Sequence, residues 1–332
     1  MASENFADIG KVEALRRLYA VSAYKDVSSL VFRSCGEVRQ SSRLYVEGVD
    51  FSLVYFPLKH LGYKSVIGVT GPLYAGLARP RLLSATLGVS QKLDFENIRE
   101  LWTGITVAAK EHGYEAVKLD LQPSPNGLYI NLNATGETSL ITSKRIPKPK
   151  SMDLLCVSGP LGAAYLGLQV LEKGREDFEK TGNQPDMKDF RMIVGDYLRP
   201  ELESSTVDRI EDAEVYPSTG CFVTGGLADA VKRLSAETGL GVKVYADKIP
   251  FEGNSFEAGK RMDIDPVSAA MNGGDDMKIL FTIPIAAREK FHREFPAYDI
   301  IGHLAQPEVG AVLVTPDGVE LPMRAQGWKE EE

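Results

Sequence analysis

The residues with the clearest chemical potential are two adjacent acids, Asp275 and Asp276, in the stretch Asn272-Gly-Gly-Asp-Asp-Met-Lys-Ile-Leu-Phe-Thr282. Two glycines precede them, which is a turn signal, so we expect both acids at a tight turn leading into a strand over 278–283. Carboxylates at such a turn can contact a ligand or can serve the turn itself. The residues alone leave both alternatives open.

Other groups able to do chemistry are scattered along the chain. The four histidines show no mutual spacing typical of a metal site or a catalytic pair, which favours surface or core roles: His60, His112, His292 and His303. The three cysteines also lack metal-like spacing, and two of them, Cys156 and Cys221, stand in apolar runs. We therefore predict buried thiols and a reducing compartment. Ser158-Gly-Pro-Leu-Gly162 is a glycine-containing turn, which is only a weak phosphate signal.

Composition bounds the class of protein. The chain has 332 residues, of which 43% are hydrophobic and 25% charged, which is typical of a folded globular protein. A net charge of −8 gives no support to nucleic-acid binding. No apolar run is long enough for a transmembrane helix, and the first residues lack the pattern of a signal peptide. We expect a cytoplasmic protein that binds neither nucleic acid nor membrane.

The elements that must position these residues are read from hydrophobic periodicity. Helical patterns cover 9–21, 56–63, 77–83, 95–112, the segment after Gly162 up to 172, and 226–239. Strand patterns cover 42–51, 65–69, 84–90, 128–134, 153–158, 242–245, 278–283 and 310–315. Residues 173–190 are polar and are predicted to be a surface insertion. Helices and strands intermix without strict alternation, which favours an α+β fold.

The segment Ile146-Pro-Lys-Pro-Lys-Ser-Met152 is the best candidate for a domain boundary. Its two prolines disfavour a helix, and its lysines indicate an exposed crossing segment. We therefore predict one domain over 1–147 and a second over 148–332.

Six segments in register resemble the thiamine-monophosphate kinase family. They are Val46-Glu-Gly-Val-Asp-Phe51, Pro57-Leu-Lys-His-Leu-Gly-Tyr-Lys-Ser65, Leu155-Cys-Val-Ser-Gly-Pro-Leu-Gly-Ala-Ala-Tyr165, the stretch 272–282, Ile301-Gly-His303 and Ala325-Gln-Gly-Trp328. The stretch 272–282 looks like the family motif Gly-Glu-Asp-Tyr-Glu-Leu. The resemblance covers nearly the whole chain.

The resemblance implies a fold and a reaction. The family has the two-domain fold related to aminoimidazole ribonucleotide synthase, with an N-terminal α+β domain for nucleotide binding and dimerisation and a C-terminal α/β domain. It transfers a phosphoryl group from ATP to thiamine phosphate with the help of Mg2+. A homodimer, with ATP held near the sheet on the dimer side, is therefore expected.

The family's magnesium-binding aspartates are mostly replaced in this chain. Of seven motif aspartates, two remain, Asp26 and Asp120. The other motif positions carry Lys25, Arg43, Pro72, Phe222 and Gly225. Proline and phenylalanine have no side-chain ligand atom, and a cation repels Mg2+ by ~1–4 kcal/mol depending on local screening. We therefore expect magnesium binding to be weakened.

The resemblance also implies candidate contacts for each ligand. For the nucleotide they are Ser42, Arg43, Asp120 and Thr224, and for the substrate Asp50, Asp275 and Trp328, with Asp26 and Asp120 as vestigial metal ligands. Several alternatives stay open. Lys25 and Arg43 either contact phosphate directly or have drifted, and the two remaining aspartates are metal ligands or ordinary loop residues. Trp328 either stacks on a cationic heterocycle or covers the core.

These observations predict a thiamine-monophosphate kinase-like protein with lost or much reduced catalysis and a residual ligand-binding role. Two alternatives remain. The chain is an active kinase with a reduced metal set, or a non-catalytic partner that dimerises with an active paralogue.

Overall fold

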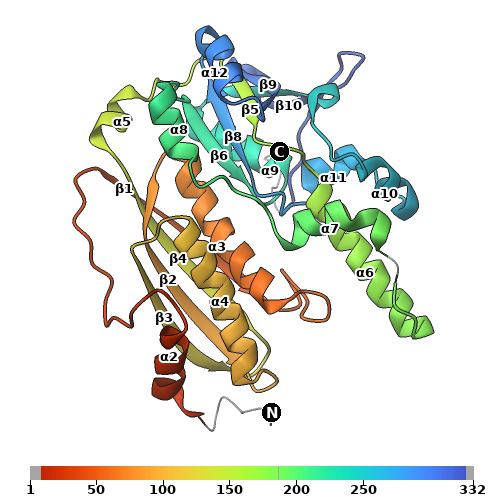
Figure 1. Cartoon of the computed structure of the whole chain (residues 1–332). Coiled ribbons are helices and arrows are strands. Elements are labelled where there is room, and N and C mark those ends of the chain that lie inside the picture. Colours follow the sequence, from red (N-terminus) through yellow and green to blue (C-terminus); the bar gives the residue numbers. More distant parts are fainter. Residues whose placement is uncertain (1–8, 186, 327–332) are drawn as a thin grey trace. The chain divides into compact units, whose positions relative to one another are not determined.

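The computed structural model describes residues 9–185 and 187–326, and these fold into two compact units that divide at Leu140 and Ile141 (Figure 1). The predicted boundary between residues 147 and 148 falls later in the connecting segment and stays a prediction. Helix α5 (Leu140–Arg145) makes contacts in the second unit, where Arg145 Nη1 donates to Glu214 Oε1 over 2.8 Å.

The first unit is a four-stranded sheet with helices on one face. Its elements in chain order are α2 (Lys11–Ala20), β1 (Glu37–Val46), α3 (Leu58–Ala75), β2 (Arg79–Ser90), α4 (Phe95–Glu111), β3 (Ala116–Ser124) and β4 (Tyr129–Thr138). The strand order is β1-β4-β2-β3, in which only the β2–β3 pair is parallel. Both β1 and β3 are therefore edge strands of this sheet.

Helices α3 and α4 lie side by side over the sheet (Figure 1). Two glycines permit this close approach, because a Cβ on Gly104 would lie 2.0 Å from the carbonyl oxygen of Lys59, and one on Gly62 would lie 2.2 Å from that of Leu101. The strands alternate between buried residues under these helices and more exposed residues on the opposite face. We call this second face the open face.

Two of the sequence-based assignments in this unit are wrong. Residues 65–69 are not a strand but the middle of α3. Residues 77–83 are not helical, because 77–78 precede β2 and 79–83 are its first part. Nearly every residue of α3 is buried, so the helix has no polar face to give a period of 3.6. The β-branched residues Val66, Ile67 and Val69 then imitate a buried strand. The helix over 95–112 is confirmed, with a capping box at Asp94 and Gly113 at φ 75° after its end.

The second unit holds a seven-stranded sheet of order β11-β10-β7-β9-β5-β8-β6, antiparallel except for the β10–β7 pair. Its strands are β5 (Leu154–Val157), β6 (Thr219–Val223), β7 (Gly241–Tyr245), β8 (Lys278–Ile283), β9 (Asp299–Ala305), β10 (Ala311–Val314) and β11 (Glu320–Pro322). Its helices are α6 (Ala163–Thr181), α7 (Arg191–Leu198), α8 (Thr206–Ala213), α9 (Leu227–Thr238), α10 (Ser255–Met262), α11 (Pro266–Asn272) and α12 (Arg288–Glu294). Short 3₁₀ turns cover Lys188–Phe190, Ala246–Lys248, Ile285–Ala287 and Pro307–Val309.

The core of this unit forms where α9 packs on the sheet. Val231 and Leu234 of α9 join a cluster with strand residues such as Val244, and a second cluster lies between α6, α7 and α10. The predicted surface insertion over 173–190 is wrong in its first part, because α6 continues to Thr181. The α+β interpretation is confirmed in both units.

Two thiols of this unit are withdrawn from solvent, as the sequence predicted. Cys156 is buried and Cys221 is half-buried. Burial raises the pKa of Cys156 to about 12 and that of Cys221 to about 11, because the thiolate is poorly solvated there. Both thiols are therefore protonated and unreactive at neutral pH.

Candidate functional site

The open face of the first sheet brings together polar side chains from all four strands. Two adjacent rows cross the sheet in register: Ser42, Asn133, Ser84 and Lys118 in one, and Leu44, Asn131, Thr86 and Asp120 in the next. Ser42 and Asp120 thus share a face but stand on its opposite edges. Three strand spacings separate them, or roughly 14 Å, so the structure does not bring these two predicted contacts together.

Arg43 lies on the other side of the sheet from Ser42. It is in register with Leu132, a residue buried under the helices, and its guanidinium lies over the ring of Tyr45 at 4.8 Å. The cation is therefore directed to the helix-covered face, where it stacks on an aromatic ring. The predicted nucleotide contacts Ser42 and Arg43 cannot both face one ligand on the open side.

Asp120 is already engaged by a cation of the chain. Lys11 Nζ of α2 lies 2.5 Å from Asp120 Oδ1, and Gln122 Nε2 donates to Oδ2 over 3.0 Å. Lys11 first, and then Gln122, lower the pKa of Asp120 below its usual range, which keeps the carboxylate charged. Sequence reasoning missed Lys11, because nothing in the chain signals a pairing over such a sequence distance.

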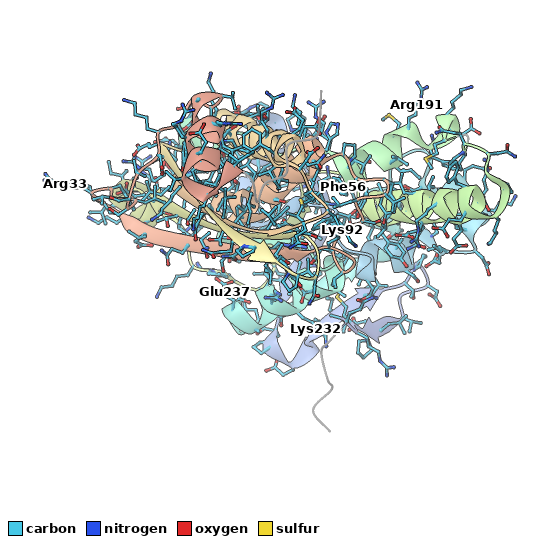
Figure 2. All side chains as sticks on the ribbon, turned by 90° about the horizontal axis from the view of Figure 1, so that it is seen from below. Arg33, Phe56, Lys92, Arg191, Lys232 and Glu237 are labelled. Atoms are coloured by element: carbon cyan, nitrogen blue, oxygen red, sulfur yellow. The ribbon has the colours of Figure 1, made fainter. Side chains whose placement is uncertain are left out.

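Asp26 belongs to a loop, residues 21–36, that runs along β3. Tyr24 donates from its hydroxyl to the carbonyl oxygen of Tyr114 over 3.1 Å, and Lys118 Nζ donates to that of Ser28 over 2.5 Å. Arg33 lies at the exposed tip of the loop (Figure 2). Asp26 itself is exposed.

Tyr19 links Asp26 to the neighbourhood of Asp120. Its hydroxyl accepts from the N–H of Leu119 over 2.8 Å and donates to the carbonyl oxygen of Val117 over 3.2 Å, which satisfies the free edge of β3. Burial raises the pKa of Tyr19 to about 12, and the negative charge of Asp26 adds to this. Tyr19 therefore bonds to β3 at Leu119, the residue before Asp120, and is also affected by the charge of Asp26.

Thr224 and Asp275 are backbone neighbours in the second unit. The N–H of Asp275 donates to the carbonyl oxygen of Thr224 over 2.8 Å. Thr224 follows β6, and Asp275 lies in the turn between α11 and β8 with φ 61°. The turn predicted from the two glycines is therefore present, and a candidate nucleotide contact and a candidate substrate contact lie side by side.

Asp276 is the most buried carboxylate of this turn, with 4% of its surface exposed. Its Oδ2 accepts from the N–H of Gly162 over 2.9 Å, and its Oδ1 from that of Ala164 over 3.4 Å, at the start of α6. Burial raises the pKa of Asp276 to about 7, against the lowering effect of these two hydrogen bonds and of Lys278. The sequence indicated a turn here but not the buried bridge to α6.

Asp50 serves a turn of the first unit. Its Oδ2 accepts from the N–H of Val46 over 2.8 Å, at the end of β1, and the side chain is half-buried. A backbone role therefore exists beside the predicted contact with substrate. Trp328, the other predicted substrate contact, lies outside the described residues.

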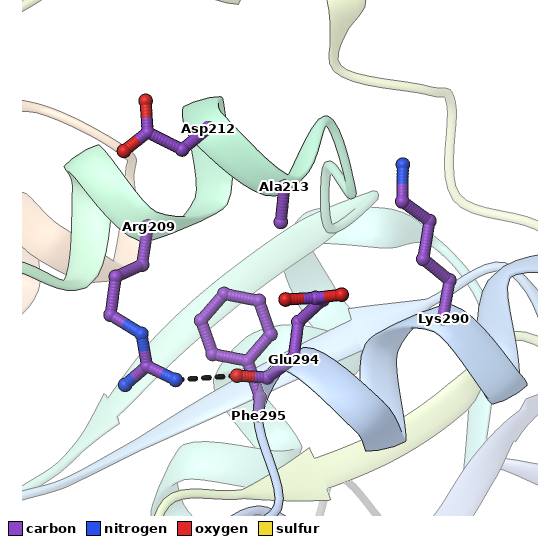
Figure 3. Close-up of a pocket in the computed structure, with 6 residues that line it drawn as sticks. All are labelled: Arg209, Asp212, Ala213, Lys290, Glu294 and Phe295. Atoms are coloured by element: carbon purple, nitrogen blue, oxygen red, sulfur yellow. Dashed lines mark hydrogen bonds between the residues drawn. The ribbon is translucent and has the colours of Figure 1, made fainter.

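A hollow of about 300 Å³ opens between α8 and α12 of the second unit (Figure 3). Arg209 lies over the ring of Phe295 at 4.8 Å and binds the carboxylate of Glu203 through Nη1, at 2.7 Å from each oxygen. Lys290, Asp212 and Glu294 complete the rim. Its charges are mixed and none of the predicted site residues lines it, so it gives no second candidate for the ligand site.

Two kinds of feature are absent from the described residues. Within 9–185 and 187–326, no three histidine, cysteine, aspartate or glutamate side chains form a group able to hold a metal ion. Across the same part of the chain, no helix has the length and apolar character needed to cross a bilayer.

The curated proteins that this chain resembles include thiamine-monophosphate kinases. No family model matches the chain. The thiamine-monophosphate kinase of Aquifex aeolicus is 21% identical over 99% of both chains, and that of Pyrococcus horikoshii is 26% identical over 74% of this chain and 70% of its own.

Solved structures agree at the level of the fold. AaThiL complexed with AMPPCP and TMP matches with a TM-score of 0.73 at 18% identity, covering 97% of both chains. The hydrogenase maturation protein HypE in complex with ATP matches with a TM-score of 0.66 at 17% identity, covering 90% of this chain and 88% of the other. The chain is thus similar over nearly its full length to thiamine-monophosphate kinases, and it shares the fold of their solved structures.

Proposed function

We propose that this chain is a thiamine-monophosphate kinase-like protein that binds ATP or a related nucleotide and a thiamine-like ligand, with phosphoryl transfer lost or much reduced. The AMPPCP and ATP complexes of its structural neighbours support the nucleotide, and the TMP complex supports the second ligand. One observation carries the loss of catalysis. One of the two remaining motif carboxylates, Asp120, is bound by Lys11 of the same chain.

The residues present do not fit a site for several Mg2+ ions. Magnesium takes octahedral oxygen coordination, and several ions around a polyphosphate need several free carboxylates. Asp120 is engaged by Lys11, and Asp26 stands in an exposed loop. Pro72 lies inside α3, and Arg43 adds a positive charge to the chain where the family has a carboxylate. We therefore derive no reaction step through Mg2+.

This loss matters because of the charges that the reaction brings together. Transfer from ATP to a phosphate monoester joins two highly negative groups, and catalysis consists largely of positioning and charge neutralisation. Each preorganised charge contact in such a site is worth kcal-scale stabilisation of the transition state. Without several metal contacts, binding of both ligands is retained more easily than turnover.

The ligand contacts that we propose fall in two places. On the open face, Ser42 and the neighbouring Asn133, with Asp120 at the far edge, present groups that hydrogen-bond a nucleotide. In the second unit, Thr224 and Asp275 lie side by side, and the carboxylate of Asp275 suits the positive ring of a thiamine-like ligand. Trp328 and, in the first unit, Asp50 remain separate candidates for contact with the substrate.

We also propose a homodimer formed through the open face of the first sheet. The described helices of this unit leave that face uncovered, and a sheet with an uncovered face is a natural site for a second copy. The HypE–HypF complex shows that a structural neighbour assembles with another protein, so pairing with an active paralogue is the alternative partner.

A specific observation also favours the second candidate, an active kinase with a reduced metal set. Tyr19 bonds to Leu119, next to Asp120, and is also affected by the charge of Asp26. A single ion carried in with the nucleotide phosphates would need these two carboxylates to come together and Lys11 to release Asp120.

Calorimetric titration of the purified protein with AMPPCP, once with excess Mg2+ and once with EDTA, tests this proposal. We expect binding in both conditions with little difference in affinity. Ser42→Ala and Asn133→Ala should weaken binding, whereas Thr103→Ala should not, because that hydroxyl donates to its own helix at Arg99. Binding only in the presence of Mg2+ would favour the active kinase, and no binding in either condition would contradict the nucleotide proposal.

A further inference from the structure

The turn between α11 and β8 has an unusually demanding backbone. Gly274 has φ 83°, and two residues with side chains also have positive φ, Asp275 at 61° and Met277 at 51°. Each such non-glycine residue costs of order 1–3 kcal/mol and persists only where the surroundings hold it. Something must therefore stabilise this turn from outside.

Backbone hydrogen bonds tie the turn to one side of its surroundings. The N–H of Asp275 donates to Thr224 over 2.8 Å and that of Met277 donates to Val223 over 2.9 Å. These contacts anchor the turn along the end of β6. The opposite side of the turn is contacted by Asp276, the residue between Asp275 and Met277.

The side chain of Asp276 supplies the second anchor. Its two oxygens accept from the N–H groups of Gly162 and Ala164, at the start of α6. Those N–H groups have no partner within their own helix, and the helix dipole favours a negative charge at this end. Asp276 thus joins the turn to a 19-residue helix.

The charged groups around Asp276 come from its own turn and from β8. Asp275 disfavours its negative charge and Lys278 favours it, while burial disfavours it most. On the α6 side the contacts are the backbone N–H groups of Gly162 and Ala164. Lys278 also acts on Asp196 of α7, a half-buried acid whose pKa is raised by burial.

We propose that Asp276 is a positioning residue of the ligand site, because its bridge to the start of α6 holds Asp275 beside Thr224. The inference rests on the proposed function, in which Asp275 contacts a thiamine-like ligand. Asp276 touches no ligand in this account. It acts through the conformation of the turn.

The protonation of Asp276 then controls the strength of the bridge. A carboxylate accepts two N–H groups more strongly than a carboxylic acid does. With the pKa of Asp276 at about 7, it is mostly protonated at pH 6 and mostly ionised at pH 8. If the bridge needs the ionised form, ligand affinity rises roughly tenfold over that range.

The test compares the wild type with Asp276→Asn and Asp276→Glu, titrated calorimetrically with thiamine monophosphate at several pH values between 6 and 8. Asp153→Asn is the matched control, since Asp153 is another buried acid of this unit and bonds instead to Ser218 and the N–H of Lys150. The phosphate of the ligand titrates equally in every variant. Only a difference in pH slope between variants therefore reports on Asp276.

We expect the asparagine variant to bind more weakly at pH 8 and to lose most of the pH slope, and the glutamate variant to recover part of both. The control should keep the wild-type slope. An Asp276→Asn variant with the wild-type slope and affinity would overturn the inference.

Amide hydrogen exchange at Asp275 and Met277 separates this inference from the proposed function. If the wild type binds no thiamine monophosphate, the proposed function fails. Faster exchange at both amides in Asp276→Asn would still support positioning, and unchanged exchange would overturn it. If that variant does not fold, amide exchange at Asp275 and Met277 is measured in the wild type at pH 6 and 8 and corrected for the intrinsic rate. Faster corrected exchange at pH 6 would support the inference, and equal exchange at both pH values would overturn it.

Discussion

Asp120 in the first unit and Asp276 in the second carry the same chemical group in opposite surroundings. The side chain of Asp120 is 40% exposed, and Lys11 keeps its pKa low and its charge present. Asp276 is 4% exposed, and burial raises its pKa to about 7. One acid has a cation as its partner, and the other has backbone N–H groups at a helix end.

The comparison concerns the partner that each acid has. In the first unit the charge of Asp120 is intact and is paired with a lysine of the same chain. In the second unit the acid is buried in a turn whose backbone is held on both sides. Lys11 therefore competes with any metal ion for Asp120, whereas the turn that carries Asp275 is held in place by its own backbone contacts and by Asp276.

The largest expected effect is the pH dependence of stability due to Asp276. Its folded-state pKa of about 7 lies above the ordinary value of 3.8, so the folded protein binds this proton more tightly than the unfolded chain. Its contribution is therefore complete below about pH 4 and is lost as the pH rises through 7, by about 4 kcal/mol in total.

Urea unfolding of the wild type and of Asp276→Asn from pH 4 to 8 measures this effect. The unfolding free energy of the variant should rise relative to that of the wild type as the pH rises. A pH-independent difference would show that Asp276 has an ordinary pKa, and the contrast with Asp120 would collapse.

A somewhat smaller effect of opposite sign is expected in the first unit from His112. This residue is 3% exposed, its Nδ1 bonds the hydroxyl of Tyr74 over 2.9 Å, and its Nε2 has no hydrogen-bond partner among the described residues. Burial lowers its pKa to about 4. Its contribution to stability is complete above about pH 6.5 and is lost as the pH falls toward 4, by about 3 kcal/mol.

Comparing unfolding of the wild type with His112→Gln over pH 4 to 7 checks this second prediction. The wild type should lose stability relative to the variant on acidification. Equal slopes for both proteins would mean that His112 has the same pKa in the folded and unfolded states, and that only the second unit responds to pH through a buried group.

The smallest effect is expected from Lys11→Ala. Removal of the lysine should raise the pKa of Asp120 toward its ordinary value and cost less than about 1 kcal/mol of stability, since the pair is exposed. It should also strengthen Mn2+ binding, measured by electron paramagnetic resonance with Mn2+ as the probe for Mg2+. Lys92→Ala, another exposed lysine of this unit, is the control. Unchanged Mn2+ binding would mean that Lys11 is not what keeps metal from Asp120.

Local signals predicted much of the fold and part of the site. Gly113 ended a helix where expected, alternation located the strand that became β4, and two glycines located the turn that holds Asp275. Each of these features depends on residues that are close together in the chain, and sequence patterns can detect such local relations.

Features that depend on distant partners were missed. The run of β-branched residues in α3 resembled a strand because the helix is buried all round, which only the packing of α4 explains. The Lys11–Asp120 pair and the contacts of Asp276 with α6 join residues far apart in sequence. Arg43 was placed correctly in a strand, but the face to which it points follows from register with β4.

The most direct test of the account is the formation of thiamine diphosphate by the purified, folded protein, given thiamine monophosphate, ATP and excess Mg2+, at near-stoichiometric protein concentration. The account predicts no product, or a trace that does not change in Asp120→Asn. Product that forms steadily and disappears in Asp120→Asn would contradict it, because the kinase would then work with the carboxylates that remain.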